Sequence, residues 1–524
     1  MSDGVVLIGL PGSGKTTVGS LVAERLGRPF IDIDHEIRRV VGRASADVLA
    51  HEGEPCLREL ERAAVSTAVQ TPGAVIATGG GTVLDPLNRW LLMEHGMRVR
   101  LDAPMDQLAR RLREDTATPR PLLGGDLEGG LQRTADARAE VYAAVDAVVD
   151  ASADADSIAR AVLGKCDSWS AKTWRPLLDL GFERHHPIGP RRGRLLTGRG
   201  LDAGVLDSAV SGTPAYLVDR RAPSVISPGE RVHTMDGGEH VKSMAQLERV
   251  LIWLSDIQLE RSDPLVVIGG GTVGDLGGLA AALHRRGVPL VNVPTTWLAQ
   301  ADSSIGGKVA IDLPAVKNGV GAFWPATLIV DDADLLVSLT EERLRDGIAE
   351  CLKAGLIADP LLWQLVEERG RAAVAGEDAA ATYAITERAI RVKLDIVDRD
   401  PFEIGERRKL NLGHTIGHAL EIESGYALAH GEAVALGLRA VARIAAGRAA
   451  QSDLADRIDS VLGNLGFPMR RAFDRTAVIS ALSGDKKREA GRQRWILPLA
   501  VGEVAEVSDV TTTELDAALD VIAA

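Results

Sequence analysis

The chain has 524 residues and a mass of 55.5 kDa, more than one hydrophobic core usually serves, which excludes a single small domain. With 45% hydrophobic and 25% charged residues, its composition is that of a folded globular protein, which excludes a disordered or membrane-embedded chain. The 60 Lys and Arg residues against 73 Asp and Glu residues give a net charge of −13. This balance disfavours a nucleic-acid partner but leaves room for local basic pockets that bind small anions.

The cysteines and the first residues indicate a reducing compartment. Cys56, Cys166 and Cys351 are widely scattered and form no CxxC pair, so disulfides are not expected to stabilise the fold. The sequence begins MSDGVVLIGL, without a basic leader before an apolar stretch, and it holds no run of about 18 apolar residues. We therefore expect a cytoplasmic protein with no membrane partner.

Strand-like and helix-like segments alternate in the first part of the chain. The runs VVLIG, AVIATGGG and RVRLD, separated by Ala-, Arg- and Leu-rich stretches, predict a parallel sheet with crossover helices over residues 1–165. The periodicity then fails, and we predict a linker over 166–185. A second alternation predicts another α/β domain over 186–334, and Ala-rich amphipathic segments predict a mostly helical domain over 335–524.

The first predicted strand runs into a glycine-rich loop, GLPGSGKTT. Gly9, Gly14, Lys15 and Thr16 have the GxxxxGK[ST] spacing before a helix, where backbone N–H groups cradle phosphates. Lys15 would reach the β- and γ-phosphate oxygens, and Thr16 would reach Mg²⁺. The alternative, a glycine turn without a ligand, fits this context poorly. The predicted ATP-binding residues are Gly9, Gly12, Gly14, Lys15, Thr16 and Thr17.

Further motifs indicate the acceptor. FIDIDHEI, EPCLRELE, ATGGGTV, RPLL and RAEVY supply, in chain order, Asp32 and Asp34, Arg58, Gly79 to Gly81, Arg120 and Arg138. Carboxylates after a strand suit a metal ion and a hydroxyl group, and arginines suit a carboxylate or a transferring phosphoryl group. Through these motifs, residues 1–165 resemble shikimate kinase along their whole length.

The resemblance implies phosphorylation of the 3-hydroxyl of shikimate with ATP and Mg²⁺. Asp34 would hold and deprotonate that hydroxyl, while Thr16 and Asp32 would organise Mg²⁺. Arg120 would lie on a mobile lid that closes over the phosphates, and it would act in catalysis with Lys15 and Asp34. The shikimate-binding residues that the resemblance implies are Asp34, Arg58, Gly79, Gly80, Gly81 and Arg138.

A second glycine cluster follows the strand-like run of LVVIGGGTVGDLGG. The turn from Gly269 to Gly271, with a helix opening near Asp275, would let the backbone approach a pyrophosphate. It would equally serve close packing, so by itself it leaves NAD binding open. In VPTTWLAQADSSIGGKVAIDLPAVKNGVGAFWP, polar residues crowd an otherwise apolar region, and Lys308, Lys317 and Asn318 could converge there on an anion.

Acidic and histidine residues gather in the last third of the chain. Glu350 and Lys353 lie one helical turn apart in GIAECLKAG and so share a face. Three of the 11 histidines, at 414, 418 and 430, fall within 17 residues. Because His414 and His418 are four residues apart, their spacing alone predicts that this pair binds a metal ion from one helix face. The alternative, histidines without a metal, stays open at this point.

These motifs, with DGGEHVK before them and DKK after them, make residues from about 180 to 524 similar to 3-dehydroquinate synthase. The resemblance changes the metal prediction. It implies Zn²⁺ or Co²⁺ held by Glu350, His414 and His430, with His418 in contact with the substrate. A carboxylate and two imidazoles leave coordination positions open for vicinal hydroxyl groups.

The resemblance also implies NAD⁺ on the glycine turn and a homodimer in which Arg286 is lent to the substrate phosphate of the other subunit. The catalytic residues that it implies are Lys308, Lys353 and His418. The implied NAD-binding residues are Glu239, Lys242, Gly269, Gly270, Gly271, Asp275, Thr295, Thr296, Asp302, Lys308, Lys317, Asn318 and Ser338. The implied substrate-binding residues are Arg286, Asp302, Lys308, Asn318, Lys353, Lys393, Arg407, Asn411, His414, His418, Lys486 and Lys487.

The sequence therefore predicts a bifunctional α/β enzyme. A P-loop kinase domain with a parallel sheet would precede a Rossmann-like NAD-binding domain and a mostly helical metal-binding domain. The second half would convert 3-deoxy-arabino-heptulosonate 7-phosphate to 3-dehydroquinate and phosphate, with NAD⁺ recycled.

Two alternatives remain. The first is another small-molecule kinase fused to another sugar-phosphate cyclase or to an alcohol dehydrogenase, and the arginines and lysines of the two sites disfavour it. The second is a non-catalytic nucleotide-sensing scaffold, and it is disfavoured because Lys15, Asp34, Glu350, His414 and His430 are all present.

Overall fold

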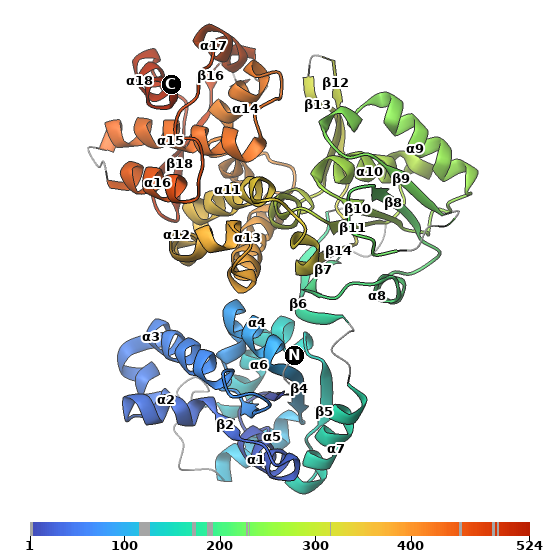
Figure 1. The fold of residues 1–524 in the computed structure, drawn as a ribbon, viewed down its shortest axis with the longest axis vertical. Helices are drawn as coiled ribbons and strands as arrows, with labels where there is room; N and C mark the ends of the chain where they lie inside the picture. The colour runs from blue at the N-terminus through green and yellow to red at the C-terminus, as the bar shows by residue number, and fades with distance from the viewer. Residues whose placement is uncertain are drawn as a thin grey trace. The chain divides into compact units, whose positions relative to one another are not determined.

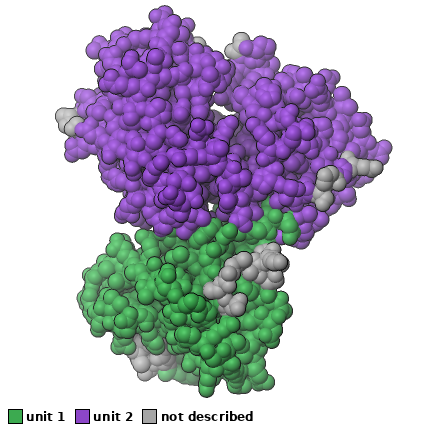
Figure 2. All heavy atoms as spheres, in the orientation of Figure 1, with its two compact units in different colours: residues 1–181, 195–202 green, residues 182–194, 203–524 purple. Residues whose placement is uncertain are grey.

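A computed structural model of the chain describes residues 4–114, 126–169, 174–185, 192–226, 229, 231–314, 316–449, 453–484, 488–489 and 492–524. Figure 1 shows their helices and strands. Contacts divide the chain into two compact units, drawn in different colours in Figure 2. Unit 1 contains residues 1–181 and 195–202, and unit 2 contains residues 182–194 and 203–524.

Unit 1 contains a five-stranded parallel sheet with the strand order β2-β3-β1-β4-β5. The apolar run of β1 is buried along its whole length and pairs with β3 on one side and β4 on the other. The strand order reverses at β1, so the carboxyl ends of β1 and β3 border a crevice suited to a ligand. The strands are β1 (Gly4–Ile8), β2 (Phe30–Asp32), β3 (Val75–Ala77), β4 (Gly96–Asp102) and β5 (Ala147–Asp150).

Helices pack against this sheet and complete its core. Val5 and Leu7 of β1 pack with Val22 of α1 and Ile158 of α7. The helical segments of unit 1 are α1 (Lys15–Leu26), α2 (Ile33–Val41), α3 (Ser45–Ala68), η1 (Thr82–Leu84), α4 (Pro86–His95), α5 (Met105–Glu114), α6 (Leu127–Ala143) and α7 (Ala155–Ser168).

The segment 166–185, predicted as a linker, is not a plain loop. It contains the end of α7 and strand β6 (Arg175–Glu183), and β7 (Arg192–Arg199) follows. Leu178, Leu180 and Phe182 alternate along β6 and are buried. This alternation is a strand signal, but the tryptophans, prolines and basic residues around it obscure the period of two.

The second sheet has the strand order β6-β7-β14-β11-β10-β8-β9, and its strands from β14 to β9 run parallel. A hairpin of β12 (Lys308–Leu313) and β13 (Val316–Phe323) lies outside this sheet and packs on α10 (Gly271–Leu283). The remaining strands are β8 (Ala215–Asp219), β9 (Val232–Met235), β10 (Leu265–Gly269), β11 (Leu290–Pro294) and β14 (Leu328–Asp332). The other helical segments are α8 (Ala203–Ala209), η3 (Glu239–Val241), α9 (Met244–Asp256), η4 (His284–Arg286), the π-helical turn η5 (Ala299–Ser303) and η6 (Ala333–Leu336).

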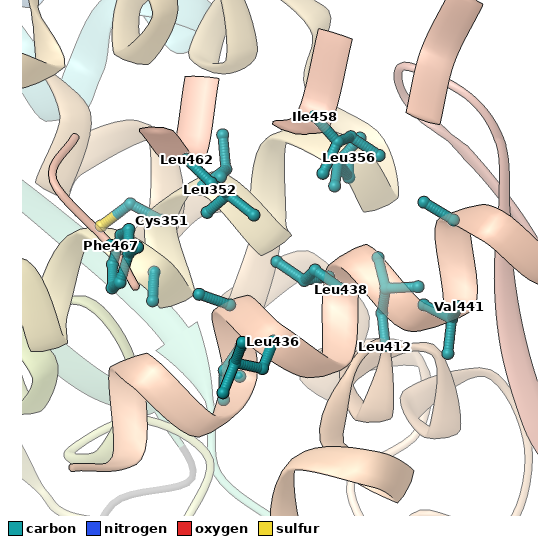
Figure 3. Close-up of a cluster of buried hydrophobic side chains, with 14 of the residues drawn as sticks. Cys351, Leu352, Leu356, Leu412, Leu436, Leu438, Val441, Ile458, Leu462 and Phe467 are labelled. Atoms are coloured by element: carbon teal, nitrogen blue, oxygen red, sulfur yellow. The ribbon is translucent and has the colours of Figure 1, made fainter. Parts of the chain in front are cut away.

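The rest of unit 2 is mostly helical. Figure 3 shows part of its core, where Leu352 and Leu356 of α11 lie among Leu438, Ile458 and other apolar side chains. The segments are α11 (Glu341–Ala358), α12 (Pro360–Val374), α13 (Ala379–Arg399), η7 (Glu406–Asn411), α14 (His414–Glu423), α15 (His430–Ala449), α16 (Asp453–Asn464), α17 (Arg475–Gly484), β15 (Arg488–Glu489), β16 (Arg492–Gln493), β17 (Trp495–Ala500), β18 (Glu503–Val507) and α18 (Thr512–Ile522). The predicted fold class is confirmed: a parallel α/β unit precedes a second α/β part and a helical part. Among the described residues, no helix is long and apolar enough to cross a membrane, and the three cysteines are free.

Candidate active sites

The glycine-rich loop of unit 1 connects β1 to α1. Lys15 Nζ donates to the carbonyl oxygens of Gly9 at 2.9 Å and Leu10 at 3.1 Å, so its charge is held over the loop. Gly14, which precedes α1, has a φ of 89°, a left-handed conformation that favours glycine. Thr16 Oγ1 donates to Asp32 Oδ2 at 2.7 Å, which pairs the two predicted Mg²⁺ residues.

Asp34 and Arg58 lie beside the triple-glycine turn after β3. A Cβ atom added to Gly79 would lie 3.1 Å from Asp34 Oδ1, and one added to Gly81 would overlap the Arg58 guanidinium. Burial raises the pKa of Asp34 above its ordinary value, and the nearby Asp32 charge adds to this rise. A hydrogen bond donated by Ser45 opposes the rise without cancelling it. A raised pKa makes Asp34 a stronger base for a hydroxyl proton.

Arg138 and Tyr142 close the other side of the glycine turn. A Cβ atom on Gly80 would lie 3.0 Å from Arg138 Nη1, and Tyr142 Oη donates to the Gly80 carbonyl oxygen at 2.9 Å. The predicted shikimate-binding residues of unit 1 thus surround one turn. Arg120 lies outside the described residues.

The second glycine turn lines an open pocket of about 380 Å³. Gly270 precedes α10, and Thr295 N donates to the carbonyl oxygen of Gly269 at 3.0 Å, which joins the ends of β10 and β11. Asp275 and Lys308 also line the pocket. Free N–H groups at the start of a helix suit a pyrophosphate.

Polar residues beside this turn form one network. Lys242 Nζ lies 2.7 Å from Asp275 Oδ2 and donates to Asn318 Oδ1 at 2.5 Å. Glu239 Oε1 lies 3.8 Å from Lys242 Nζ and 3.5 Å from Lys317 Nζ. Five of the predicted NAD-binding residues therefore contact one another, although they come from η3, α10 and β13.

Glu350, His414 and His430 form a compact cluster whose ligand atoms all lie within 4.8 Å of one another. Glu350 Oε1 lies 3.4 Å from His414 Nε2 and 3.2 Å from His430 Nε2. The Nδ1 atom of His414 lies 3.1 Å from the carbonyl oxygen of Leu412, which can only accept, so Nδ1 would carry the ring proton when Nε2 binds a metal ion. One carboxylate and two imidazoles suit Zn²⁺ or Co²⁺.

The charge around the cluster favours a cation. Burial opposes ionisation of Glu350, but the Lys353 ammonium and a hydrogen bond with His430 outweigh it and lower the pKa to about 2. Burial would also lower the pKa of His430, but hydrogen bonds with Glu350 and Glu421 raise it to about 10. The carboxylates that stabilise a proton on His430 equally stabilise a metal ion at this position.

Four predicted cations lie around this cluster and the hairpin. Lys353 Nζ pairs with Glu350 and donates to the carbonyl oxygen of Leu410 at 2.8 Å. Lys393 Nζ lies 2.5 Å from Asp302 Oδ1, and burial lowers the pKa of Lys393 despite this partner. The other two cations are Arg407, which donates to Gly306 and Pro401 carbonyl oxygens, and Lys308, which pairs with Glu403.

Some predicted residues lie apart from these groups. His418 Nε2 is 3.9 Å from Glu421 Oε2, and His418 is not among the three residues of the metal cluster. The HxxxH spacing alone therefore does not select the compact cluster, although the His418 ring lies 5.0 Å from the His414 ring. Ser338 and Arg286 are exposed, beyond η6 and on η4 respectively. Lys486 and Lys487 lie outside the described residues.

Three carboxylates that the sequence analysis did not single out belong to these sites. Glu61 Oε2 lies 2.5 Å from Arg58 Nη1, and Thr82 donates to its other oxygen. Glu403 pairs with Lys308 and accepts from Asn411 at 3.0 Å. Glu421 lies 3.2 Å from His430. Glu61 and Glu421 follow Arg58 and His418 by three residues, a helical spacing that could have marked them.

Comparison with known proteins agrees with both geometries. The shikimate kinase family model matches residues 11–167, and the N-terminal and C-terminal models of 3-dehydroquinate synthase match residues 232–346 and 347–488. A 3-dehydroquinate synthase of Xanthomonas campestris pv. campestris (strain 8004) is 39% identical over 336 residues, which are 62% of this chain and 89% of that protein. A 3-dehydroquinate synthase of Symbiobacterium thermophilum is 41% identical over 282 residues, 53% of this chain and 78% of that protein.

A solved structure shares the fold of the second part. It is a 2-epi-5-epi-valiolone synthase from Streptomyces hygroscopicus subsp. jinggangensis 5008 with NAD⁺ and Zn²⁺ bound. It is 28% identical with a TM-score of 0.59, and the match covers 64% of this chain and 98% of that one. The chain therefore belongs to the 3-dehydroquinate synthase family and carries a shikimate kinase domain ahead of its synthase part.

Proposed function

We propose that the chain is a bifunctional enzyme of the shikimate pathway. Its first part transfers a phosphoryl group from ATP to shikimate, and its second part converts 3-deoxy-arabino-heptulosonate 7-phosphate to 3-dehydroquinate and phosphate. The observation that carries the second activity is the buried cluster of Glu350, His414 and His430 beside Lys353, in the same unit as a glycine turn suited to NAD⁺.

In the kinase part, the loop before α1 binds the phosphates of ATP, with Lys15 over their oxygens. Thr16 and Asp32, already paired at 2.7 Å, hold Mg²⁺. Asp34 accepts the proton of the shikimate hydroxyl, and Arg58 and Arg138 bind the shikimate carboxylate across the glycine turn. Positioning and charge neutralisation supply most of the catalysis of phosphoryl transfer.

In the synthase part, Glu350, His414 and His430 hold the metal ion. When bound, the metal supplies Lewis-acid polarisation of a hydroxyl group, and NAD⁺ supplies a reversible hydride acceptor. Lys353 and Lys393 lie at the buried end of the site and orient the polar groups of the sugar acid. Arg407 and Asn411 of η7 and Lys308 of β12 bind the substrate anions, with Lys308 and Asn411 held by Glu403.

The synthase part acts as a homodimer in this proposal. Arg286 is exposed on η4, where a second copy of the chain can receive it. Mixing an Arg286→Ala chain with a Glu350→Gln chain should restore synthase activity, because some mixed dimers then contain one complete site. If the two variants exchange subunits but the mixture stays inactive, Arg286 does not act in the site of the other subunit.

The deciding experiment uses the purified full chain in two assays. Phosphate release from the heptulosonate phosphate with NAD⁺ should stop after chelation and return with Zn²⁺ or Co²⁺. Shikimate-dependent ADP formation should require Mg²⁺ and be indifferent to NAD⁺. Failure of the heptulosonate phosphate to react, with turnover of another sugar phosphate instead, would assign the second part to a different cyclase.

A further inference from the structure

Glu421 of α14 is a buried carboxylate between two parts of the synthase site. It is 3% exposed, and its Oε1 lies 3.2 Å from His430 Nδ1 and 3.4 Å from Lys317 Nζ. Within the described residues its Oε2 has no hydrogen-bond partner, since His418 Nε2 at 3.9 Å is too distant. A carboxylate is kept at such a position only where cations and donors compensate for its lost hydration.

The contact with His430 fixes the tautomer of a proposed metal ligand. Both ring nitrogens of His430 face carboxylate oxygens, which can only accept, so with a metal ion on Nε2 the one ring proton would sit on Nδ1, toward Glu421. Nε2, which faces Glu350 Oε1 at 3.2 Å, then presents its lone pair to the cluster. His414 is held in the same way by the carbonyl oxygen of Leu412. Partners of this kind orient metal-binding imidazoles and increase their basicity.

Lys317 links Glu421 to the dinucleotide side of the site. Its Nζ lies 3.4 Å from Glu421 Oε1 and 3.5 Å from Glu239 Oε1, and it lies over the Tyr426 ring at 5.3 Å. Lys317 belongs to β13 and Glu239 to η3, both of which carry proposed NAD⁺ contacts. One ammonium group therefore joins the dinucleotide-binding residues to the carboxylate that orients His430.

We infer that Glu421 is a positioning residue for the metal ion and that Lys317 couples NAD⁺ binding to metal binding, each ligand tightening the other. The inference rests on the proposed function of the synthase part. A dinucleotide bound to Glu239 and Asn318 holds β13 in place. The ion pair between Lys317 and Glu421 then stays formed, and Glu421 keeps its hydrogen bond with His430. Because linkage is reciprocal, the metal ion tightens NAD⁺ binding by the same factor.

The test measures both affinities in the full chain without turnover. Co²⁺ affinity is determined by competition with a chelator, with and without saturating NAD⁺, and NAD⁺ affinity is determined by calorimetry with and without Co²⁺. The variants are Glu421→Gln, Lys317→Met and Lys317→Arg. The matched control is the exposed pair of Arg371 and Glu341, 2.6 Å apart in the same unit, changed to Arg371→Met and Glu341→Gln.

NAD⁺ should tighten Co²⁺ binding to the wild-type chain about 5-fold or more. Lys317→Met should bring this factor close to one, and Lys317→Arg should retain the factor. Glu421→Gln should weaken Co²⁺ binding about 10- to 100-fold. The control variants should behave like the wild type.

Three results would overturn the inference. A wild-type chain that binds both ligands with no mutual effect disproves the coupling and leaves the proposed function standing. If NAD⁺ tightens Co²⁺ binding to Lys317→Met as much as to the wild-type chain, a residue other than Lys317 couples the two ligands. Because Lys317 is partly exposed, this variant should stay folded even if Glu421→Gln does not. A wild-type chain that binds neither Co²⁺ nor NAD⁺ disproves the proposed function and the inference together.

Discussion

The two sites hold their cations in different ways. In unit 1, Lys15 Nζ donates to the neutral carbonyl oxygens of Gly9 and Leu10, which hold it over the glycine-rich loop. In unit 2, Lys353 and Lys393 are paired with Glu350 and Asp302, which belong to the same site. The first site thus holds its lysine through backbone carbonyl groups, whereas the second holds its lysines in ion pairs that must rearrange when a metal ion and a substrate enter.

The difference follows from burial. Lys15 is half-buried, in a loop that follows the carboxyl end of β1, the central strand of its sheet. Lys353 and Lys393 are 3% and 8% exposed, and a buried cation without a partner carries a large desolvation cost. Burial by itself would raise the pKa of Asp302, but the Lys393 ammonium outweighs burial and lowers it.

The largest expected effect tests whether each activity depends only on the stability of the unit that contains its site. Asp146 lies between Arg98 and Arg175, at 2.9 and 3.1 Å, with side chains 4%, 2% and 6% exposed. Asp146→Asn leaves two buried guanidinium groups facing each other and should cost unit 1 about 3–5 kcal/mol of stability. Thermal inactivation should therefore remove kinase activity at a lower temperature than synthase activity. The exposed substitution Glu128→Gln should change little.

The stability from Asp146 should also depend on pH. Burial would raise the pKa of Asp146, but Arg98 and Arg175 outweigh it and lower the pKa below its ordinary value. The contribution is therefore present above the unfolded pKa of about 3.9 and is lost as the pH falls through the folded pKa. Acid unfolding followed by circular dichroism should show Asp146→Asn losing this dependence. An unchanged acid transition would contradict the role of the pair.

The second prediction concerns Lys15 of the glycine-rich loop. Lys15→Met should lower kinase turnover about 10²- to 10³-fold, because the developing charge on the phosphates loses a fixed cation. Phosphate release from the heptulosonate phosphate should not change. A matched Lys165→Met substitution on exposed α7 should leave both rates intact. A parallel loss of synthase activity in folded Lys15→Met protein would show that the two sites are not independent.

The third prediction addresses the metal cluster. Glu350→Gln removes the charge between His414 and His430 and should weaken Co²⁺ binding about 100-fold or more, since loss of an outer partner alone costs about 10- to 100-fold. Synthase activity should fall while kinase activity stays constant. Glu342→Gln, in the exposed first turn of the same helix, is the control. Unchanged Co²⁺ affinity in Glu350→Gln would place the metal elsewhere.

The sequence predicts unit 1 better than unit 2 because its ligand groups are local. The loop from Gly9 to Thr16 predicts a strand, a turn and a helix, and the structure has β1 and α1 on either side of this loop. In unit 2, spacing alone selects His414 and His418, whereas the compact cluster joins His414 to residues 64 positions earlier and 16 positions later. Such pairings depend on how α11, α14 and α15 pack, which periodicity does not report.

The carboxylates that complete the sites could not be predicted from the sequence for a related reason. Glu403 and Glu421 contact lysines 95 and 104 residues away in the chain, so no local pattern pairs these carboxylates with Lys308 and Lys317. β6 was hidden because its alternation of Leu178, Leu180 and Phe182 is short and is flanked by loop-like composition. In each case the sequence gives the residue type but not the distant residues that it contacts in the fold.

The smallest expected effect tests whether the Glu403 carboxylate, besides neutralising Lys308, also positions Lys308 and Asn411. Glu403 pairs with Lys308 and accepts from Asn411 Nδ2 at 3.0 Å, in a loop whose N–H groups at 404, 405 and 407 donate to Asp400. Glu403→Gln keeps an acceptor for Asn411 but removes the charge that holds Lys308. We expect kcat/KM of the synthase reaction to fall about 10-fold, equivalent to about 1.4 kcal/mol, mainly through KM.

The matched control for Glu403→Gln is Glu406→Gln, which alters an exposed ion pair with Lys409 at 3.1 Å in the neighbouring turn. Steady-state kinetics at increasing ionic strength separate two causes. If Glu403 only neutralises charge, salt should mask the defect, because exposed Lys308 is readily screened. If it positions Lys308 and Asn411, the defect should persist in salt. A variant as active as the wild type would show that the cations of the second site need no carboxylate to hold them, and the contrast with Lys15 would then disappear.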